Sequence, residues 1–406
     1  MLTPIADIGS PTTGVNLRCA ICIDASTILY ASNAGDLIRS TYYNQSVAAG
    51  TGSSTSFSGL ALYSAASAIG SYSASSRFDL IDLATLQVTP VTTGANSTLN
   101  ATAGQQLAAN ASTGFAMATQ ALAGRVSIVN CLTRLSSSFT ITGISGQTGN
   151  CVIVKDNNFL LGTDNGQIYE INTNGVIVAS YQVPRTPGNN NTPNIFPIVS
   201  LAYAPSSTVL AATGGGELIA INWAASSLIN ELVGYEFTYP GAGVSLSNFS
   251  SGVVVYSSDN PGNGLFQGFS EVFLTSKGVS ALDTTFMNTY QPQGTHDIQL
   301  DPTGTKGVIV SNDTNGQTYK IRTFSLTPTS QTTVKTRAQD PIGVDITGSI
   351  IRIRDRGYGK VVIDLDQVIA AGDNFPIAAN DNNYIEVLLN GATGSSEKWD
   401  VREFTA

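Results

Sequence analysis

The chain has 406 residues, of which 42% are apolar and only 12% are charged, about half of the charged share near one quarter that soluble domains usually have. The net charge is −9 and the 19 basic residues form no long run, which excludes the clustered lysines and arginines that a nucleic-acid groove needs. No segment approaches the roughly 18 to 20 consecutive apolar residues of a membrane helix, and residues 1–14 lack the basic and apolar segments of a secretory signal. We therefore expect no nucleic-acid partner and no membrane insertion.

A short pattern recurs along the chain: an apolar run, a polar turn with Gly or Ser, and then alternating apolar residues. This order predicts a tight β-hairpin, because Gly or Asn supplies the positive φ that such turns require. The pattern is clearest at Gly35, Gly166, Gly216 and Gly316, and weaker copies fall in the gaps. In chain order, the predicted turn centres are Gly35, Ser76, Gly124, Gly166, Gly216, Gly264, Gly316 and Gly359.

Successive turn centres are 41 to 52 residues apart, which matches the roughly 40 to 50 residues of a propeller blade. A helical repeat of this length would show apolar positions at spacings of three and four, whereas these segments alternate. The sequence therefore predicts an all-β fold, a single β-propeller of seven to eight four-stranded blades. Eight hairpins favour eight blades, and seven remain if the first or last hairpin lies outside the ring.

Upstream of the hairpins lies a further strand that ends in a turn with Asp, Pro or Ser, as at residues 201–207 and 298–304. With this strand the repeat resembles the blades of WD-repeat and related propeller families. The His and Trp-Asp signatures of true WD repeats are absent apart from an isolated Trp223. The resemblance therefore implies the architecture alone.

The domain organisation follows from the repeat. We expect an N-terminal arm at 1–16, the propeller at 17–378, and C-terminal strands at 379–406 that close the ring or dock on a partner. A closed ring leaves no open sheet edge, so a terminal strand should complete one blade. The candidates are a C-terminal run, at 384–389 or 399–404, and an N-terminal strand near 17–23. Long loops are expected at 184–197 and 237–249.

Residues for catalysis are scarce. The single histidine, His296, precedes Asp297, but neighbours on a strand point to opposite faces, so a structural histidine is the better interpretation than a catalytic triad. Two sets of carboxylates are candidates for a calcium loop: Asp373 with Asp381 and the asparagines that follow them, and Asp364 with Asp366. Asp and Asn at such places are typical of turns, which is the favoured interpretation. We predict no catalytic, cofactor-binding or metal-binding residue, and no enzyme.

The four cysteines fit no metal site. Cys19 and Cys22 form a C-x-x-C motif, but on an extended strand they would face opposite sides, which favours buried thiols over zinc or a disulfide. Cys131 and Cys151 flank adjacent blades, and a bridge between them stays open as the alternative to two free thiols.

Three functions suit this composition. The favoured hypothesis is a structural or recognition protein of a virion, such as a phage tail, nozzle or fibre-hub component, which binds other subunits and is made in the host cytoplasm. A weakly charged polar surface suits broad permanent contacts, because desolvating charges is costly.

The alternatives are a carbohydrate-binding or carbohydrate-processing propeller, with a cell-surface glycan as partner, and a cytoplasmic scaffold for protein partners. Aromatic side chains near loops could stack on sugar rings, although Tyr also seals the outer rims of blades. The tyrosines concerned are Tyr42, Tyr43, Tyr181, Tyr235, Tyr239 and Tyr290.

Overall fold

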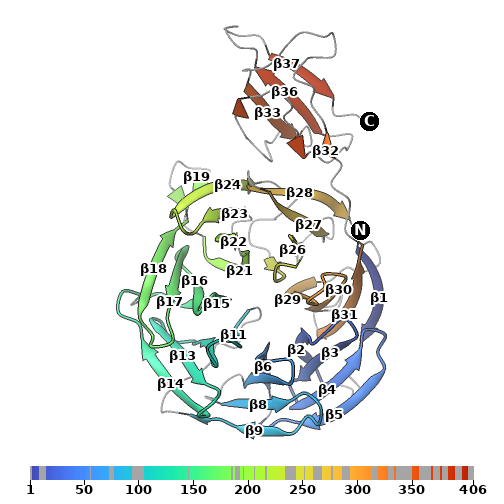
Figure 1. Cartoon of the computed structure of the whole chain (residues 1–406), viewed down its shortest axis with the longest axis vertical. Helices are drawn as coiled ribbons and strands as arrows, with labels where there is room; N and C mark the ends of the chain where they lie inside the picture. Colours follow the sequence, from blue (N-terminus) through green and yellow to red (C-terminus); the bar gives the residue numbers. More distant parts are fainter. Residues whose placement is uncertain are drawn as a thin grey trace.

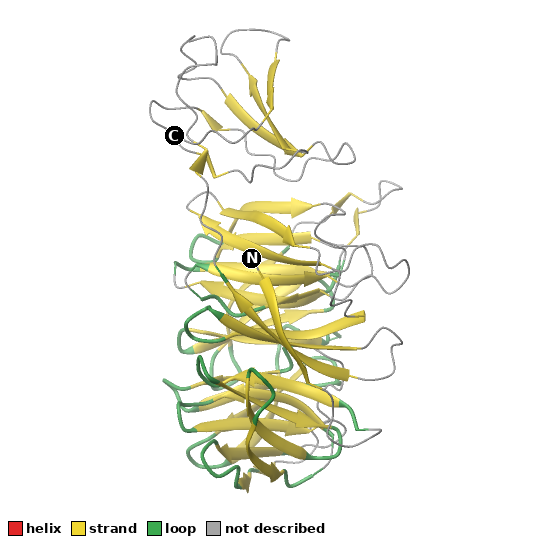
Figure 2. Ribbon diagram, turned by 90° about the vertical axis from the view of Figure 1, so that its right-hand side faces the viewer, coloured by secondary structure: helices red, strands yellow, loops and turns green. Residues whose placement is uncertain are grey.

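The computed structural model describes residues 2–8, 15–54, 56–72, 77–93, 105–144, 146–183, 186–187, 193–194, 196–204, 206–214, 217–233, 244–250, 252–258, 268–275, 278–285, 293–312, 319–327, 333–334, 350–355, 367–368, 375–376, 383–388 and 396–400. All regular secondary structure in these ranges is β-strand, as Figure 2 shows with the ring edge-on.

The strands between residues 2 and 326 form sheets arranged around a ring, which Figure 1 views along its axis. We number these ring sheets 1 to 7 in chain order, starting from β2. Sheets 1 to 3 comprise β2 (Leu17–Cys22), β3 (Thr27–Ser32), β4 (Asp36–Thr41) and β5 (Ser46–Thr51); β6 (Phe57–Leu62), β7 (Ser67–Tyr72), β8 (Phe78–Asp82) and β9 (Val88–Pro90); and β10 (Thr92–Thr93), β11 (Leu107–Asn110), β12 (Phe115–Thr119), β13 (Arg125–Asn130) and β14 (Leu135–Thr140).

Sheets 4 to 7 follow the same plan, with the first strand of each sheet nearest the axis (Figure 1). They comprise β15 (Gly149–Lys155), β16 (Asn158–Thr163), β17 (Gln167–Ile171) and β18 (Ile177–Gln182); β21 (Ile198–Ala204), β22 (Thr208–Thr213), β23 (Glu217–Asn222) and β24 (Ser227–Val233); β25 (Val244–Leu246), β26 (Val253–Ser258), β27 (Gly268–Thr275) and β28 (Gly278–Thr285); and β29 (Gln293–Leu300), β30 (Lys306–Asn312), β31 (Tyr319–Leu326) and β1 (Leu2–Ile8).

The β-propeller architecture with four-stranded antiparallel blades is confirmed, but the predicted count is not. Within the described residues, six ring sheets are four-stranded blades, whereas seven to eight were predicted and eight favoured. Sheet 3 gains a fifth strand, since β10 pairs in parallel with β14. The last predicted turn centre, Gly359, lies outside the described residues. The strand before it, β33 (Ile350–Asp355), joins a separate sheet and none of the ring sheets.

That separate sheet has the order β34 (Gln367–Val368), β33, β36 (Asn383–Leu388) and β37 (Ser396–Asp400), and Figure 1 draws it beside the ring. Two short pairs complete the described strands: β19 (Thr186–Pro187) with β20 (Pro193–Asn194), and β32 (Thr333–Val334) with β35 (Phe375–Pro376). The pair β19 and β20 falls within the predicted long loop at 184–197.

The ring is closed by β1, which pairs antiparallel with β31 from Leu2↔Leu326 to Ile8↔Ile321. The expectation that a C-terminal run or a strand near 17–23 closes the ring is therefore wrong, and part of the expected arm at 1–16 belongs to sheet 7. The C-terminal runs cannot take this place because β36 pairs with β33 and β37 instead. The side chain of Ile8 is fully buried, and such a burial contributes about 1.5–3 kcal/mol.

The hydrophobic core is divided into seven clusters of described residues, each at the boundary between neighbouring sheets. Alternation along each strand produces this division. On β2, for example, Cys19 and Ile21 pack toward sheet 2, whereas Ala20 and Cys22 pack toward sheet 7. Each sheet is thus held on both faces by its neighbours, which leaves the axis itself free for a cavity.

Candidate functional site

A cavity of about 340 Å³ lies on the ring axis. The innermost strands of the sheets line it, with β11 as the innermost strand of sheet 3, so that segments far apart in the sequence meet there. Its lining includes Arg18 of β2, Leu60 of β6, Val152 of β15, Tyr203 of β21 and Asp297 of β29. The volume is in the range of small-molecule pockets.

The first strand of five sheets carries a β-bulge at the same place, where one extra residue shifts the register against the second strand. The residues that follow the bulge are Cys19, Gly59, Cys151, Ser200 and Asp297. Bulges re-aim side chains and recur beside functional sites. Only sheet 7, among these five, places a charged group at this position.

Asp297 is nearly buried, with 9% of its surface exposed, and its Oδ1 has no hydrogen-bond partner. Burial raises the pKa of this carboxyl to about 7, although hydrogen bonds from the Ile298 amide and the Gln299 side chain oppose the change. The carboxyl also raises the pKa of Cys19 in the neighbouring sheet, after the larger effect of burial. Asp297 therefore titrates near neutral pH inside the ring.

Gln105 spans the cavity lining between three sheets. Its Oε1 accepts a hydrogen bond from the Leu201 amide at 2.8 Å, and its Nε2 donates to the carbonyls of Leu201 and Leu246 at 2.8 and 3.0 Å. The Gln105 carbonyl accepts from the Val152 amide at 2.7 Å. This residue therefore satisfies backbone groups that the innermost strands would otherwise leave unpaired.

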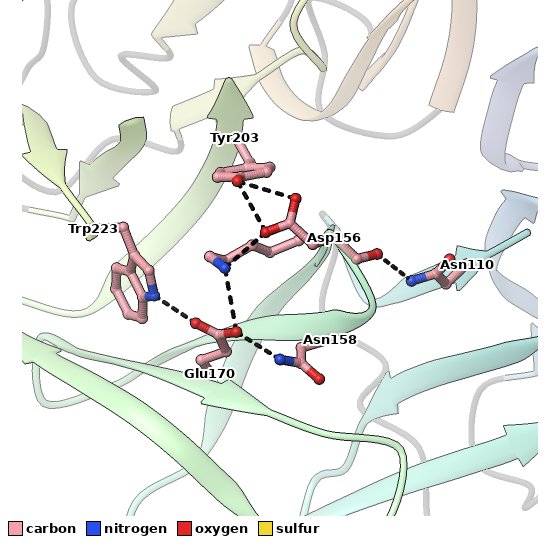
Figure 3. A network of polar contacts seen from close by, with 7 residues as sticks. Asn110, Asp156, Asn158, Glu170, Tyr203 and Trp223 are labelled. Carbon is pink, nitrogen blue, oxygen red and sulfur yellow. Dashed lines mark hydrogen bonds and ion pairs between the residues drawn. The ribbon is translucent and has the colours of Figure 1, made fainter. Parts of the chain in front are cut away.

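A polar network adjoins the cavity where sheets 3, 4 and 5 meet (Figure 3). At its centre, Glu170 of β17 accepts hydrogen bonds from the Trp223 indole at 2.6 Å, Asn158 at 2.6 Å and Lys155 at 3.2 Å. Glu170 is buried and the Lys155 side chain is only 12% exposed. Burial lowers the pKa of Lys155, but Asp156 and Glu170 raise it more, so the ammonium is retained.

The outer part of this network is exposed. Lys155 also contacts Asp156 at 2.9 Å, and Asp156 accepts from the Tyr203 hydroxyl at 3.2 Å. The hydrogen bond from Lys155 lowers the pKa of Asp156, against a smaller effect of burial. The Asp156 carbonyl accepts from Asn110 at 2.7 Å, as Figure 3 shows. Every charge in the network is thus paired, which is typical of residues that stabilise the contact between neighbouring sheets.

The exposed apolar side chains form a third feature. In an antiparallel blade, the loop between the first and second strands and the loop between the third and fourth strands lie on the same face of the ring. Most of the exposed apolar side chains lie in the loop between the third and fourth strands or just after it. We name this set the apolar rim, and it comprises Tyr43, Val47, Leu132, Leu135, Val176, Val178 and Leu228. Among the described exposed large apolar residues, Leu122 alone lies on the opposite face.

Three of the predicted turn centres are described. Gly35, Gly124 and Gly166 lie between the second and third strands of their sheets, with φ of 90°, 72° and 74°. The other predicted centres lie outside the described residues: Ser76, Gly216, Gly264, Gly316 and Gly359. The first four of these fall between paired strands of the ring sheets.

The cysteines are all free and buried, and Cys19 and Cys22 belong to different clusters. The two faces of β2 were therefore predicted correctly, and the alternative of a bridge between Cys131 and Cys151 is wrong. Burial raises the pKa of Cys22, Cys131 and Cys151 to about 12, so these thiols are unreactive. The described residues contain no cluster of His, Cys, Asp or Glu that could hold a metal ion.

His296 lies in β29 at the bulge before Asp297, and its side chain is outside the described ones, as are the four carboxylates considered for calcium. Of the tyrosines, Tyr42 is fully buried and donates to the Asp24 carbonyl at 3.0 Å, Tyr43 is 65% exposed, and Tyr181 is half-buried. Tyr235, Tyr239 and Tyr290 lie outside the described residues.

Sequence reasoning missed the network and the apolar rim. Their signals in the sequence were weak. Lys155 and Glu170 lie on the first and third strands of sheet 4, with β16 between them, and the apolar rim consists of single apolar residues in or near loops. No protein-family model matches the chain, and a search of curated proteins finds no significant match. No helix in the described part of the chain is long and apolar enough to span a membrane.

Proposed function

We propose that this β-propeller is a non-enzymatic structural or recognition protein that binds other protein subunits through the apolar rim. The observation that carries the proposal is the one-sided placement of the rim. Single exposed apolar residues are ordinary on any surface, but here they gather at one end of the outer strands in sheets 1, 3, 4 and 5. A surface with few charges loses little on desolvation, which favours a permanent contact.

We further propose that the assembly is a virion and that the chain is a tail, nozzle or fibre-hub component. The support is the low charged fraction of 12% together with the absence of a recognised catalytic set in the sequence. The test is quantitative mass spectrometry of purified virions whose genome encodes this chain. A fixed whole-number copy number per particle is expected, and absence of the chain from the particle would overturn the assignment.

A carbohydrate-binding role is the second candidate, because Tyr43 is 65% exposed on the apolar rim and an exposed aromatic ring can stack on a sugar. A glycan array probed with the purified chain separates the two candidates. Binding to a defined glycan that is lost in Tyr43→Ala would favour recognition of a cell surface. A receptor-binding subunit would show both this binding and a fixed copy number.

A further inference from the structure

The carboxylate in the axial cavity is not explained by the architecture of the ring. At the matching position after the bulge, the other sheets have Cys19, Gly59, Cys151 and Ser200. Ser200 is buried and its hydroxyl accepts a hydrogen bond from the Leu246 amide at 2.9 Å, while Cys151 is fully buried. A small uncharged residue therefore suffices for packing at this position.

Asp297 is stabilised by the chain only in part, through hydrogen bonds from the Ile298 amide and the Gln299 side chain. Its Oδ1 is buried without a hydrogen-bond partner, and no ion pair to Asp297 is found among the described residues. An ionised group left unpaired in a low-dielectric interior is destabilising. A cation in the adjoining cavity would reduce this cost through space, without displacing any existing contact.

Several charged and titratable groups lie around Asp297, and one of them, Arg18, also lines the cavity. β2 of the neighbouring sheet contributes Arg18, which has an interaction of its own, and the thiols of Cys19 and Cys22, both of whose pKa values Asp297 raises. On its own strand Asp297 follows His296, and Asp301 begins the next turn. Asp301 caps that turn, where its carboxylate accepts hydrogen bonds from the Thr305 and Lys306 amides.

The remainder of the cavity lining limits what the ligand can be. Gln105 and Gln106 use their amides in hydrogen bonds within the protein, and Asn248 accepts from the Leu300 amide at 2.8 Å. Most other lining residues are apolar, including Leu60 and Ala202. The unmet polar demand in the described lining is thus concentrated at Asp297, next to an apolar space.

We propose that the axial cavity binds a small organic cation, an ammonium group on a short apolar chain, with the ammonium beside Asp297. The volume of about 340 Å³ admits such a molecule and is too small for a folded peptide. The site is independent of the apolar rim, which lies at the outer ends of the sheets.

The test compares n-butylammonium with n-butanol, its neutral counterpart of similar shape, by saturation-transfer NMR titration of the full chain at pH 6 and pH 8. Only the ionised carboxylate attracts the cation, so n-butylammonium should bind about tenfold more tightly at pH 8 than at pH 6, given a carboxyl that titrates near 7. The affinity for n-butanol should not depend on pH. At pH 8, n-butanol should bind more weakly than n-butylammonium.

Asp297→Asn should abolish both the preference for the cation and its pH dependence, while the melting temperature shows whether the variant folds. Asp24→Asn is the matched control, because Asp24 caps an exposed turn through Oδ1 and Asn can make the same bonds. Equal binding of the two probes, binding independent of pH, or no binding of n-butylammonium would overturn the proposal. If Asp297→Asn does not fold, the two pH values with the wild-type chain still decide.

Discussion

The indole N–H of Trp223 donates a 2.6 Å hydrogen bond to Oε2 of Glu170 across the boundary between sheets 4 and 5. Trp223 belongs to the loop that follows β23, and Glu170 is the next-to-last residue of β17. The bond is charge-assisted and buried, which makes it stronger than an ordinary neutral hydrogen bond. Because Glu170 also binds Lys155 and Asn158, one carboxylate links two sheets.

Glu170→Gln should therefore destabilise the chain. The neutral amide of Gln offers one acceptor oxygen in place of the two carboxylate oxygens that bind Trp223, Asn158 and Lys155. Lys155 would lose its buried ion-pair partner and keep only the exposed Asp156. Loss of one partner of a buried pair typically costs about 3–5 kcal/mol, and partial exposure of Lys155 places the expected value at the lower end, about 3 kcal/mol. Urea denaturation measures the free energy of unfolding. A loss below about 0.5 kcal/mol, the range of ordinary surface substitutions, would contradict this view.

The stability of the ring should depend on the protonation of Asp297. Its pKa is about 7 in the folded chain against an ordinary value of 3.8, so between about pH 4 and pH 7 the folded state holds a proton that the unfolded state has released. This contribution is present at low pH and is lost as the pH rises through 7, with a slope of up to about 1.4 kcal/mol per pH unit.

Asp297→Asn removes this titration. Urea denaturation of both proteins from pH 4.5 to pH 8 should show that the wild type loses stability relative to the variant as the pH rises, with the difference constant above about pH 8. A difference that is independent of pH, or one that changes in the opposite direction, would show that the carboxyl titrates normally.

The thiols of the four cysteines should be unreactive in the folded chain. All four thiols are buried, and burial raises their pKa values, so the thiolate that reacts is scarce at pH 8. A colorimetric thiol reagent should modify none of them within minutes in native buffer and all four in denaturant. Rapid modification of a single thiol without denaturant would contradict this prediction and would show that the boundary between sheets at that cysteine opens in the folded chain.

Ring closure by the N-terminal strand gives a further prediction. Removal of residues 1–8 should expose the edge of β31, delete the buried Ile8 and break the contact of Asp7 with Arg322 at 3.6 Å. We expect a lower melting temperature and aggregation through the free edge. Removal of residues 379–406, the matched control, should leave the melting temperature of the ring unchanged. The reverse pattern would show that the C-terminal strands close the ring.

Local signals explain why the hairpins could be predicted and the closure could not. Gly166 marks its turn because a positive φ is required there, and the strands beside it alternate in the sequence. A second local signal went unused. At the end of the third strand in sheets 1 to 5, or one residue beyond it in sheet 4, stands a residue whose side-chain oxygen accepts a backbone N–H bond of the next turn. It lies six residues after each predicted centre. These residues are Thr41, Asp82, Asn130, Asn172 and Asn222.

The remaining features depend on contacts between distant segments. Ala6 donates to Thr323 at 3.1 Å over a separation of 317 residues, and no pattern within Leu2–Ile8 names that partner. Asp297 was visible as a neighbour of His296, but its burial follows from the packing of sheet 7 against sheet 1. The apolar rim likewise becomes one surface only when successive sheets are placed side by side.

The role of the apolar rim is tested most directly by incorporation of variants into virions. Leu132→Ser and Val176→Ser change exposed residues of the rim, and Leu122→Ser is the matched control because Leu122 is similarly exposed on the opposite face. Complementation with each variant, followed by quantitative mass spectrometry of purified particles, gives the copy number. We predict that both rim variants fall well below the wild-type copy number while Leu122→Ser matches it; equal incorporation of all three folded variants would contradict assembly through the rim.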